Sequence, residues 1–404
     1  MVQLIRRGVA TTRPELADAT HLGRNIISHR IRAGQEVGLV EPDGSGRSRG
    51  GRAAEVWRFR HDAGQVLVCV VEKEFLRTLL TDLGGNILSE SQVVWSLGSG
   101  VDSTLEQVAQ EAEKLLKEAG IQKPWGACIA VPTTVDVAEG RMASPVVPID
   151  SPYRWPLDVD IRGWFAQRLG VPVWLASVSK LMPLGALMTP GAPKELVYIR
   201  MGSNIMGGLA ANGRVCHGAQ WMAGSLGHVT VSDEQTRICS CGRYGCLDTV
   251  AGGGAMVADA KDAVAQGRSP YLAKATVKHE LAVDDISEGA KVGDTVCVEI
   301  VVRAATMLGR ALSAMIAWGN PARIIIGGSA IAHNELFLTV LRQTIQVSTL
   351  ASFYENLEIV QGDPEQRELV TGAVGLVVEY LISPPYLAAW GPGGSPADCP
   401  EMQS

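Results

Sequence analysis

One imidazole and three thiols are spaced closely enough along this sequence to bind a metal ion together. They are His228, Cys239, Cys241 and Cys246. A shell of three thiolates and one imidazole is closed and tetrahedral, which is typical of structural zinc sites and leaves no open position for catalysis. Gly242 and Gly245 would let the chain turn tightly around the ion. The other five cysteines are scattered, so the pattern favours a structural Zn2+ ion in a reducing compartment over a disulfide framework.

A second set of side chains could recognise DNA. The sequence predicts a helix over about residues 24–36, with polar side chains at positions i, i+3, i+4 and i+7. This polar stripe and the arginine at the helix start are Arg24, Asn25, Ser28, His29 and Arg32. Ile27 and Ile31 fall on the other side, where they would pack on the preceding helix. Arginine suits guanine and asparagine suits adenine in the major groove, so we interpret the stripe as a recognition surface rather than an ordinary solvated face.

The elements around this helix form the pattern of a winged helix-turn-helix. Thr12 and Glu15 match a capping box, which predicts a first helix over residues 14–19, followed by a tight turn. After Gly38 the sequence predicts a hairpin with a tip rich in Gly, Ser and Arg. The wing arginines expected to reach phosphate or a narrow minor groove are Arg47, Arg49 and Arg52. The segment from His61 to Gly64 is the expected hinge to the body.

The charge is divided unevenly along the 404 residues. Residues 1–60 contain 11 arginines, no lysine and 6 acidic residues, a net charge of +5. The remainder has 25 basic and 36 acidic residues, a net charge of −11. A basic head on an acidic body is typical of a nucleic-acid-binding head, although a solvated basic surface explains the charge equally well.

The body is predicted to contain two α/β halves with the same order of elements. In the first half, strands are expected over residues 65–71, 75–81, 87–95, 126–131 and 171–175, with helices over 104–119 and near 161–169. A looser repeat begins at Glu195 and ends in a helix over residues 365–381. Two such halves facing each other across a cleft form an α/β body of the actin-like ATPase, ribonuclease H-like type.

These patterns predict four segments. They are a winged helix-turn-helix domain over residues 1–62, a first actin-like subdomain over 63–190, a second subdomain with the zinc site over 191–364, and a disordered tail over 383–404. The helix over residues 365–381 is expected to pack back on the first subdomain. No apolar run long enough to cross a bilayer and no signal peptide is recognised, so the sequence predicts a cytoplasmic protein that does not contact a membrane.

The zinc motif and four other segments resemble the ROK family (repressors, open reading frames and kinases). The similar segments are residues 223–228 with 239–248, 130–136 with Gly140, 169–173, 320–328 and the wing triplet 51–53. The resemblance covers essentially residues 1–382. It implies an actin-like fold, a bound zinc ion, and assembly as a homodimer or homotetramer.

Departures from the family's kinase motifs indicate that the chain is not an enzyme. The first phosphate turn of the kinases is Asp-x-Gly-Gly-Thr, but here Val70 to Glu74 places Glu72 where it would repel phosphate. The second turn, Gly202 to Met206, has lost two of its glycines. The position of the catalytic aspartate is Val178, and a valine cannot take a proton from a sugar hydroxyl.

The sugar contacts implied by the resemblance are also altered. The positions that would face an effector are Ser177, Ser225 and Asp248, and Val146 stands where the family has a sugar-binding asparagine. A site that has lost hydrogen-bonding groups binds a polyol weakly. The cleft is therefore expected to hold a ligand with fewer hydroxyl groups than a hexose, or none.

Taken together, the residues predict a ROK-type transcriptional repressor that binds a palindromic double-stranded operator and responds to a small-molecule effector, sugar-like or other. Two alternatives remain open. One is a sugar kinase that is also a regulator, which Val178 disfavours. The other is a redox sensor that loses zinc when its thiols are oxidised, although structural zinc sites are the commoner case.

Overall fold

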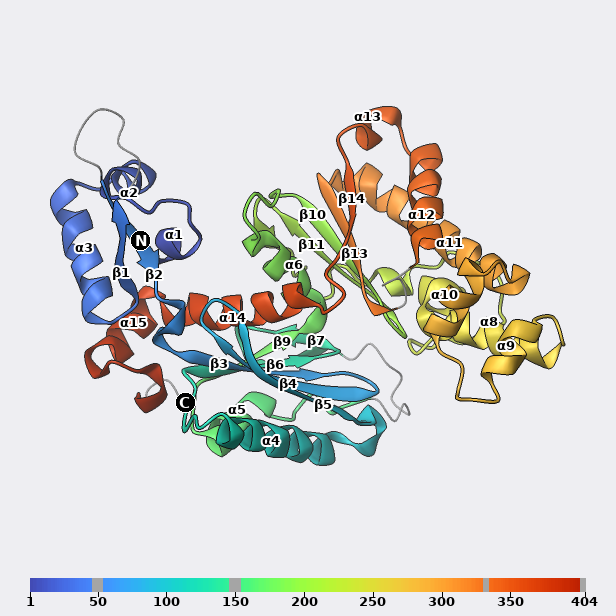
Figure 1. The fold of residues 1–404 in the computed structure, drawn as a ribbon, viewed down its shortest axis with the longest axis horizontal. Helices are drawn as coiled ribbons and strands as arrows, with labels where there is room; N and C mark the ends of the chain where they lie inside the picture. Colours follow the sequence, from blue (N-terminus) through green and yellow to red (C-terminus); the bar gives the residue numbers. More distant parts are fainter. Residues whose placement is uncertain (46–53, 145–153, 330–333, 400–404) are drawn as a thin grey trace.

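The computed structural model describes residues 1–45, 54–144, 154–329 and 334–399, and Figure 1 shows a small head beside a two-lobed body. We call residues 1–60 the head. Its elements are helices α1 (Val2–Arg6), α2 (Arg13–Thr20) and α3 (Arg24–Glu36) and strands β1 (Val40–Ser45) and β2 (Glu55–Phe59). The predicted capping box is confirmed, because the Thr12 side chain accepts a hydrogen bond from the Glu15 amide. The short helix α1 was not predicted from the sequence.

The head has its own apolar centre, which fixes α3 against the hairpin. The side chains of Ile27 and Ile31 on α3 and of Trp57 on β2 are at most 3% exposed. The Trp57 amide also donates to the Thr11 carbonyl oxygen at 2.8 Å, which ties β2 to the segment before α2. Burying one face of α3 in this way leaves its opposite face to solvent.

The first lobe is a five-stranded mixed sheet with helices on one face. Its strand order is β5-β4-β3-β6-β9. The strands are β3 (Gln65–Val71), β4 (Phe75–Asp82), β5 (Ile87–Val94), β6 (Gly126–Val131) and β9 (Val173–Ser177). Helices α4 (Val101–Glu118) and α5 (Ile161–Leu169) cover its outer face, and a short ribbon of β7 (Thr134–Asp136) and β8 (Arg141–Ser144) follows β6.

The second lobe repeats this sheet, as the sequence predicted. Its order, β12-β11-β10-β13-β14, has the same succession of antiparallel and parallel pairs. The strands are β10 (Leu196–Met201), β11 (Ile205–Ala211), β12 (Arg214–Val215), β13 (Arg323–Gly327) and β14 (Glu358–Gln361). The helices are α7 (Leu247–Ala251), α8 (Gly253–Ala265), α9 (Pro270–Ala275), α10 (Val283–Lys291), α11 (Thr295–Gly319), α12 (Glu335–Ser348) and α13 (Ala351–Tyr354).

Two helices, α6 (Val178–Met188) and α14 (Arg367–Leu381), lie between the two sheets. A single hydrophobic cluster joins them to Val68 of the first lobe and to Tyr198 of the second. The helix expected to pack on the first lobe is α14, and it does contact β3, β6 and β9. The lobes therefore meet through a shared pair of helices as well as across a cleft.

The head is attached to the body by a packed connection. The expected hinge forms a 3-10 turn, His61–Ala63, whose His61 carbonyl oxygen accepts from the Leu83 amide at 2.9 Å. A methyl group on Gly64 would overlap the ring of Trp125, so the backbone lies directly against that side chain. The same hydrophobic cluster continues from Ile31 in the head into the body.

The expected disorder of the tail, residues 383–404, is wrong as far as the structure describes it. Helix α15 (Pro384–Trp390) follows α14, and Trp390 is 1% exposed. Its indole N–H donates to the Leu381 carbonyl oxygen at 2.8 Å, and its ring lies 5.1 Å from that of Trp125. Burial of this indole helps to order the short Pro- and Gly-rich segment. Residues 400–404 lie outside the described part.

Among the residues that the structure describes, one helix is long and apolar enough to span a membrane by length and composition alone. It is α11, and 56% of its apolar window is buried within the protein. The bent pair α14 and α15 passes the same test if it is counted as one span. Because α11 packs against α8, α10 and α12, its apolar character is explained by the core of the second lobe.

Candidate functional site

The predicted metal ligands meet in space. The ligand atoms of His228, Cys239, Cys241 and Cys246 all lie within 4.8 Å of one another. His228 Nδ1 is 3.4 Å from Cys239 Sγ, and the Sγ atoms of Cys241 and Cys246 are 3.6 Å apart. Zinc–sulfur bonds of about 2.3 Å in a tetrahedron require separations of this size. The donor set and its geometry therefore fit a four-coordinate metal ion.

Local turns hold these ligands in place. A short turn, Leu226–His228, carries the imidazole, and Cys246 caps α7. The Arg243 guanidinium donates to the His228 carbonyl oxygen at 2.8 Å. Gly245 has a φ of 71°, and a methyl group there would overlap the Ser232 carbonyl oxygen. The glycine is needed both for its conformation and for space, as the sequence suggested.

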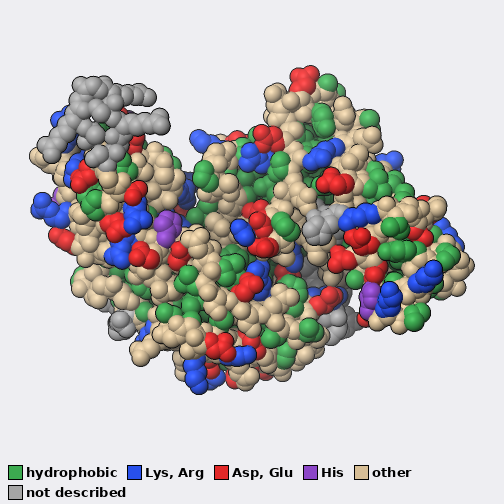
Figure 2. All heavy atoms as spheres, in the orientation of Figure 1, with side chains coloured by type: hydrophobic (Ala, Val, Ile, Leu, Met, Phe, Trp, Pro, Cys, Tyr) green, Lys and Arg blue, Asp and Glu red, His purple; other side chains and the backbone are tan. Residues whose placement is uncertain are grey.

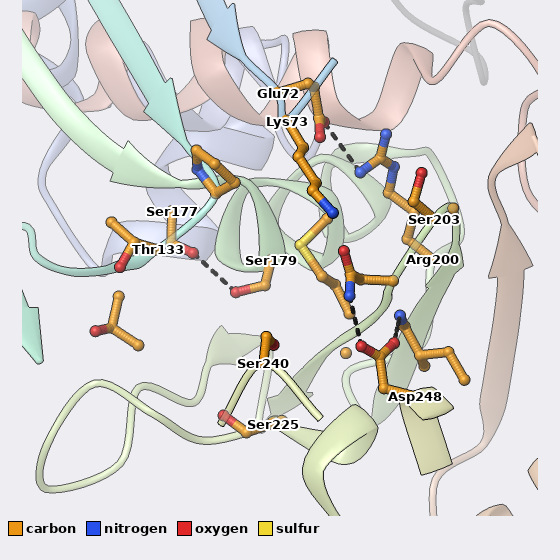
Figure 3. Close-up of a pocket in the computed structure, with 18 of the residues that line it drawn as sticks. Glu72, Lys73, Thr133, Ser177, Ser179, Arg200, Ser203, Ser225, Ser240 and Asp248 are labelled. Atoms are coloured by element: carbon orange, nitrogen blue, oxygen red, sulfur yellow. Dashed lines mark hydrogen bonds and ion pairs between the residues drawn. The ribbon is translucent and has the colours of Figure 1, made fainter. Parts of the chain in front are cut away.

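A cavity of about 330 Å3 lies between the lobes (Figure 3), next to the predicted metal site. The three predicted effector positions, Ser177, Ser225 and Asp248, all line it. His228 lines it as well, so one imidazole belongs to the metal centre and to the cavity wall. Val146 lies outside the described residues.

The polar groups predicted to face an effector already have partners in the protein. The Asp248 carboxylate accepts from the Ile205 amide at 2.6 Å and from the Asn204 side chain at 2.5 Å, while its burial raises its pKa. The Ser225 hydroxyl donates to the Met222 carbonyl oxygen at 2.7 Å. The Ser177 hydroxyl lies 2.9 Å from that of Ser179. These internal bonds compete with any hydroxyl-rich ligand.

A buried ion pair joins the first of the turns that correspond to the kinases' phosphate turns to β10, the strand that leads into the second turn. Glu72 of the first lobe and Arg200 of the second are 3.0 Å apart, with side chains 9% and 8% exposed (Figure 3). The predicted repulsion of phosphate by Glu72 therefore needs correction, because Arg200 compensates its charge. Sequence reasoning missed Arg200, although a single arginine within the apolar strand β10 was a signal that it had a buried partner.

A second residue missed from the sequence is Lys180 on α6. Its side chain is buried, and its ammonium group donates to the carbonyl oxygens of Cys216, at 3.2 Å, and Ala223. Burial lowers the pKa of Lys180 to about 8. The segment between these carbonyl groups carries Trp221 and Met222, both of which line the cavity.

The predicted recognition helix presents its polar stripe to solvent. Arg24, Asn25, Ser28, His29 and Arg32 are all exposed on α3. In the described part of the chain none of these five side chains forms an ion pair. Figure 2 shows basic side chains on the head at the left of the molecule. The wing arginines Arg47, Arg49 and Arg52 lie outside the described residues.

Comparison with known proteins gives the same fold. The family model of the ROK family matches residues 74–379. A xylose repressor of Caldicellulosiruptor bescii is 27% identical over 384 residues, which span 93% of this chain and 94% of that protein.

Two solved structures with a similar fold, one of a regulator and one of a kinase, illustrate the two kinds of relative. A ROK family transcriptional regulator, described as a homologue of the E. coli MLC protein, has a TM-score of 0.77 and 21% identity, covering 93% of this chain and 96% of that chain. A ROK family glucokinase of Streptomyces griseus, in complex with glucose and AMPPNP, has a TM-score of 0.68 and 20% identity, covering 78% and 100%. The predicted sugar-kinase-like, actin-like body is thus confirmed.

Proposed function

Because this chain belongs to the ROK family, we propose that it is a DNA-binding transcriptional repressor whose sugar-kinase-like body no longer transfers phosphate. The observation that carries the proposal is the exposed polar stripe on α3. The opposite face of this helix is buried in the head. Similarity to a xylose repressor over 93% of the chain supports it. The glucokinase structure matches a smaller share, 78%, as expected if the head is what distinguishes regulator from kinase.

In this proposal the chain is divided at the predicted boundaries. Residues 1–62 form a winged helix-turn-helix domain that reads DNA, residues 63–190 and 191–364 form the two actin-like subdomains, and the metal ion is structural zinc. The body carries a net charge of −11, so DNA affinity must come from the basic head. A homodimer or homotetramer in the cytoplasm presents paired heads to a palindromic operator.

The cavity between the lobes is the proposed effector site. Ser177, Ser225 and Asp248 would contact the ligand only with the hydrogen-bonding capacity that their internal partners leave unused. Trp221 and Met222 offer it an apolar wall. A sugar-like molecule with fewer hydroxyl groups than a hexose fits this wall, and D-xylose is the first probe to use.

We expect no sugar-dependent ATP turnover from the purified protein. Val178, at the start of α6, is fully buried and offers no base, and Glu72, paired with Arg200, occupies the first of the turns where kinases hold phosphate. A coupled assay with glucose, N-acetylglucosamine and N-acetylmannosamine should give the same rate for the wild type and the Val178→Ala control. Turnover above that control would contradict the loss of catalysis.

The proposed function is tested by recovering DNA from the native genome. The full chain is mixed with genomic fragments at physiological salt, and the bound fragments are sequenced. We expect enrichment of a few fragments that share a two-fold symmetric site, because specific affinity typically exceeds non-specific affinity by about 10^3 or more. Enrichment no greater than that of random fragments would sink the repressor assignment.

A further inference from the structure

We propose that α6 and α14 form a mechanical link from the cavity to the head. Three contacts, which we call joints, make up the link: one at Lys180, one where α6 and α14 touch at Gly185 and Gly372, and one at Glu379. The link would make operator binding depend on what the cavity holds. It rests on the proposed function, since it assigns regulation to the same cavity and the same head.

The first joint ties the cavity wall to α6. Lys180 is 4% exposed and donates to the carbonyl oxygens of Cys216 and Ala223, the two ends of one loop. At the tip of that loop, Trp221 has a φ of 62°, a conformation that few tryptophans adopt. Trp221 lines the cavity, so a ligand that shifts this ring also pulls on the ends of the loop and thus on α6.

The second joint is a contact between helix backbones. A methyl group on Gly185 of α6 would overlap the Glu368 carbonyl oxygen of α14, and one on Gly372 of α14 would overlap the Leu181 carbonyl oxygen of α6. No layer of side chains separates the helices here that could absorb a displacement by changing rotamer. Because packed interiors are stiff, movement of α6 must be passed to α14.

The third joint ties α14 to the head. Glu379, in the last turns of α14, accepts from the Gln3 side-chain amide at 3.1 Å and pairs with Arg7 at 3.4 Å. At the other end of α14, Glu368 accepts from the Tyr198 hydroxyl of the second lobe at 3.4 Å. One helix thus contacts the second lobe at its beginning and the DNA-binding head at its end (Figure 1).

Hydrogen exchange of the full chain, without ligand or DNA, tests the link. Lys180→Met removes the first joint, and Glu379→Gln weakens the third. Two exposed residues of α4 provide matched controls, Lys117→Met and Glu118→Gln. We expect Lys180→Met to speed exchange in residues 216–223 and also to change exchange in residues 2–6 by about 5-fold or more, the lower end of typical coupling between sites.

Adding Glu379→Gln, which removes the charge that pairs with Arg7, should reduce the effect of Lys180→Met on residues 2–6 and leave its effect on residues 216–223. Coupling is reciprocal, so Glu379→Gln alone should change exchange in residues 216–223. This arm keeps the test decisive if Lys180→Met does not fold, because Glu379 is 44% exposed at its side chain. Both controls should leave both segments unchanged.

The link is refuted if each variant alters only the segment it touches. Exchange needs no operator, so this result is separate from a failure of the repressor assignment, which the genomic DNA experiment detects. Where an operator is found, Lys180→Met should change its affinity about 5-fold or more in the wild-type background and by a smaller factor in Glu379→Gln. An equal change in both backgrounds would also refute the link.

Discussion

Alanine at Asn25 and at Arg32 is expected to cost about 1–3 kcal/mol each of operator binding and to relax preference at particular base pairs. Both side chains are exposed on α3, so the substitutions remove groups that would contact base edges without disturbing the core of the head. A fluorescence titration of operator and random DNA should show the loss on the operator alone.

Arg30 supplies the matched control for this experiment. It is an exposed arginine on the same helix, but at 100° per residue it lies well around the helix from the stripe. Arg30→Ala should therefore change operator and random DNA binding alike. Deleting the head, to leave residues 65–404, should reduce operator binding by about 10^3 or more. Undiminished binding by that body would refute the assignment of DNA recognition to the head.

Loss of the metal ion is expected to unfold the zinc-bearing part of the second lobe. In a closed Cys3His site the free energy of metal binding stabilises the folded state, because the site does not exist in the unfolded chain. Apparent binding free energies of about 10–16 kcal/mol are typical of zinc-finger peptides. Cys241→Ser should therefore lower the melting temperature of the second lobe sharply. It should also loosen Asp248, which lies directly after Cys246 and Leu247, from the Ile205 amide.

Cys216→Ser is the control, because this thiol lies outside the metal cluster and is partly exposed. Metal analysis should find one zinc ion per chain in the wild type and in this control, and less in Cys241→Ser. Helix α3 should remain folded in all three, since no ligand lies in the head. A wild type without zinc, or a Cys241→Ser protein that melts like the control, would contradict a structural zinc site.

Local signals in the sequence predicted the elements of the head and the clustering of the four Cys and His side chains well. Helix α3 has the predicted bounds, Arg24–Glu36, because its apolar residues recur at helical spacing and Gly23 precedes it. The metal ligands could be recognised because three of them lie close together in sequence, and the tight turn at Gly245 follows from its neighbours. In both cases the interactions that fix the structure are short in range.

The contacts that were missed join residues far apart in the chain. Glu72 and Arg200 meet only because two sheets face each other, and no residue nearby in the sequence indicates that they form a pair. Lys180 is held by backbone carbonyl groups, which any sequence supplies. The tail was assigned to disorder by its composition, but its aromatic side chains order it, since Trp390 packs against Trp125 and Tyr386 against Trp174.

The packed connection at His61–Ala63 has a consequence for avidity. A head on a free tether samples a volume set by linker length, and its effective concentration at a second half-site falls smoothly as the half-sites separate. Here the segment that joins the head to the body packs against Trp125, so the position of each head is fixed relative to the body. In an assembly of two copies, the effective concentration of the second head at its half-site would be high at one spacing of the half-sites and very low at other spacings. Operators for this protein should therefore tolerate changes in the sequence of the spacer but not in its length.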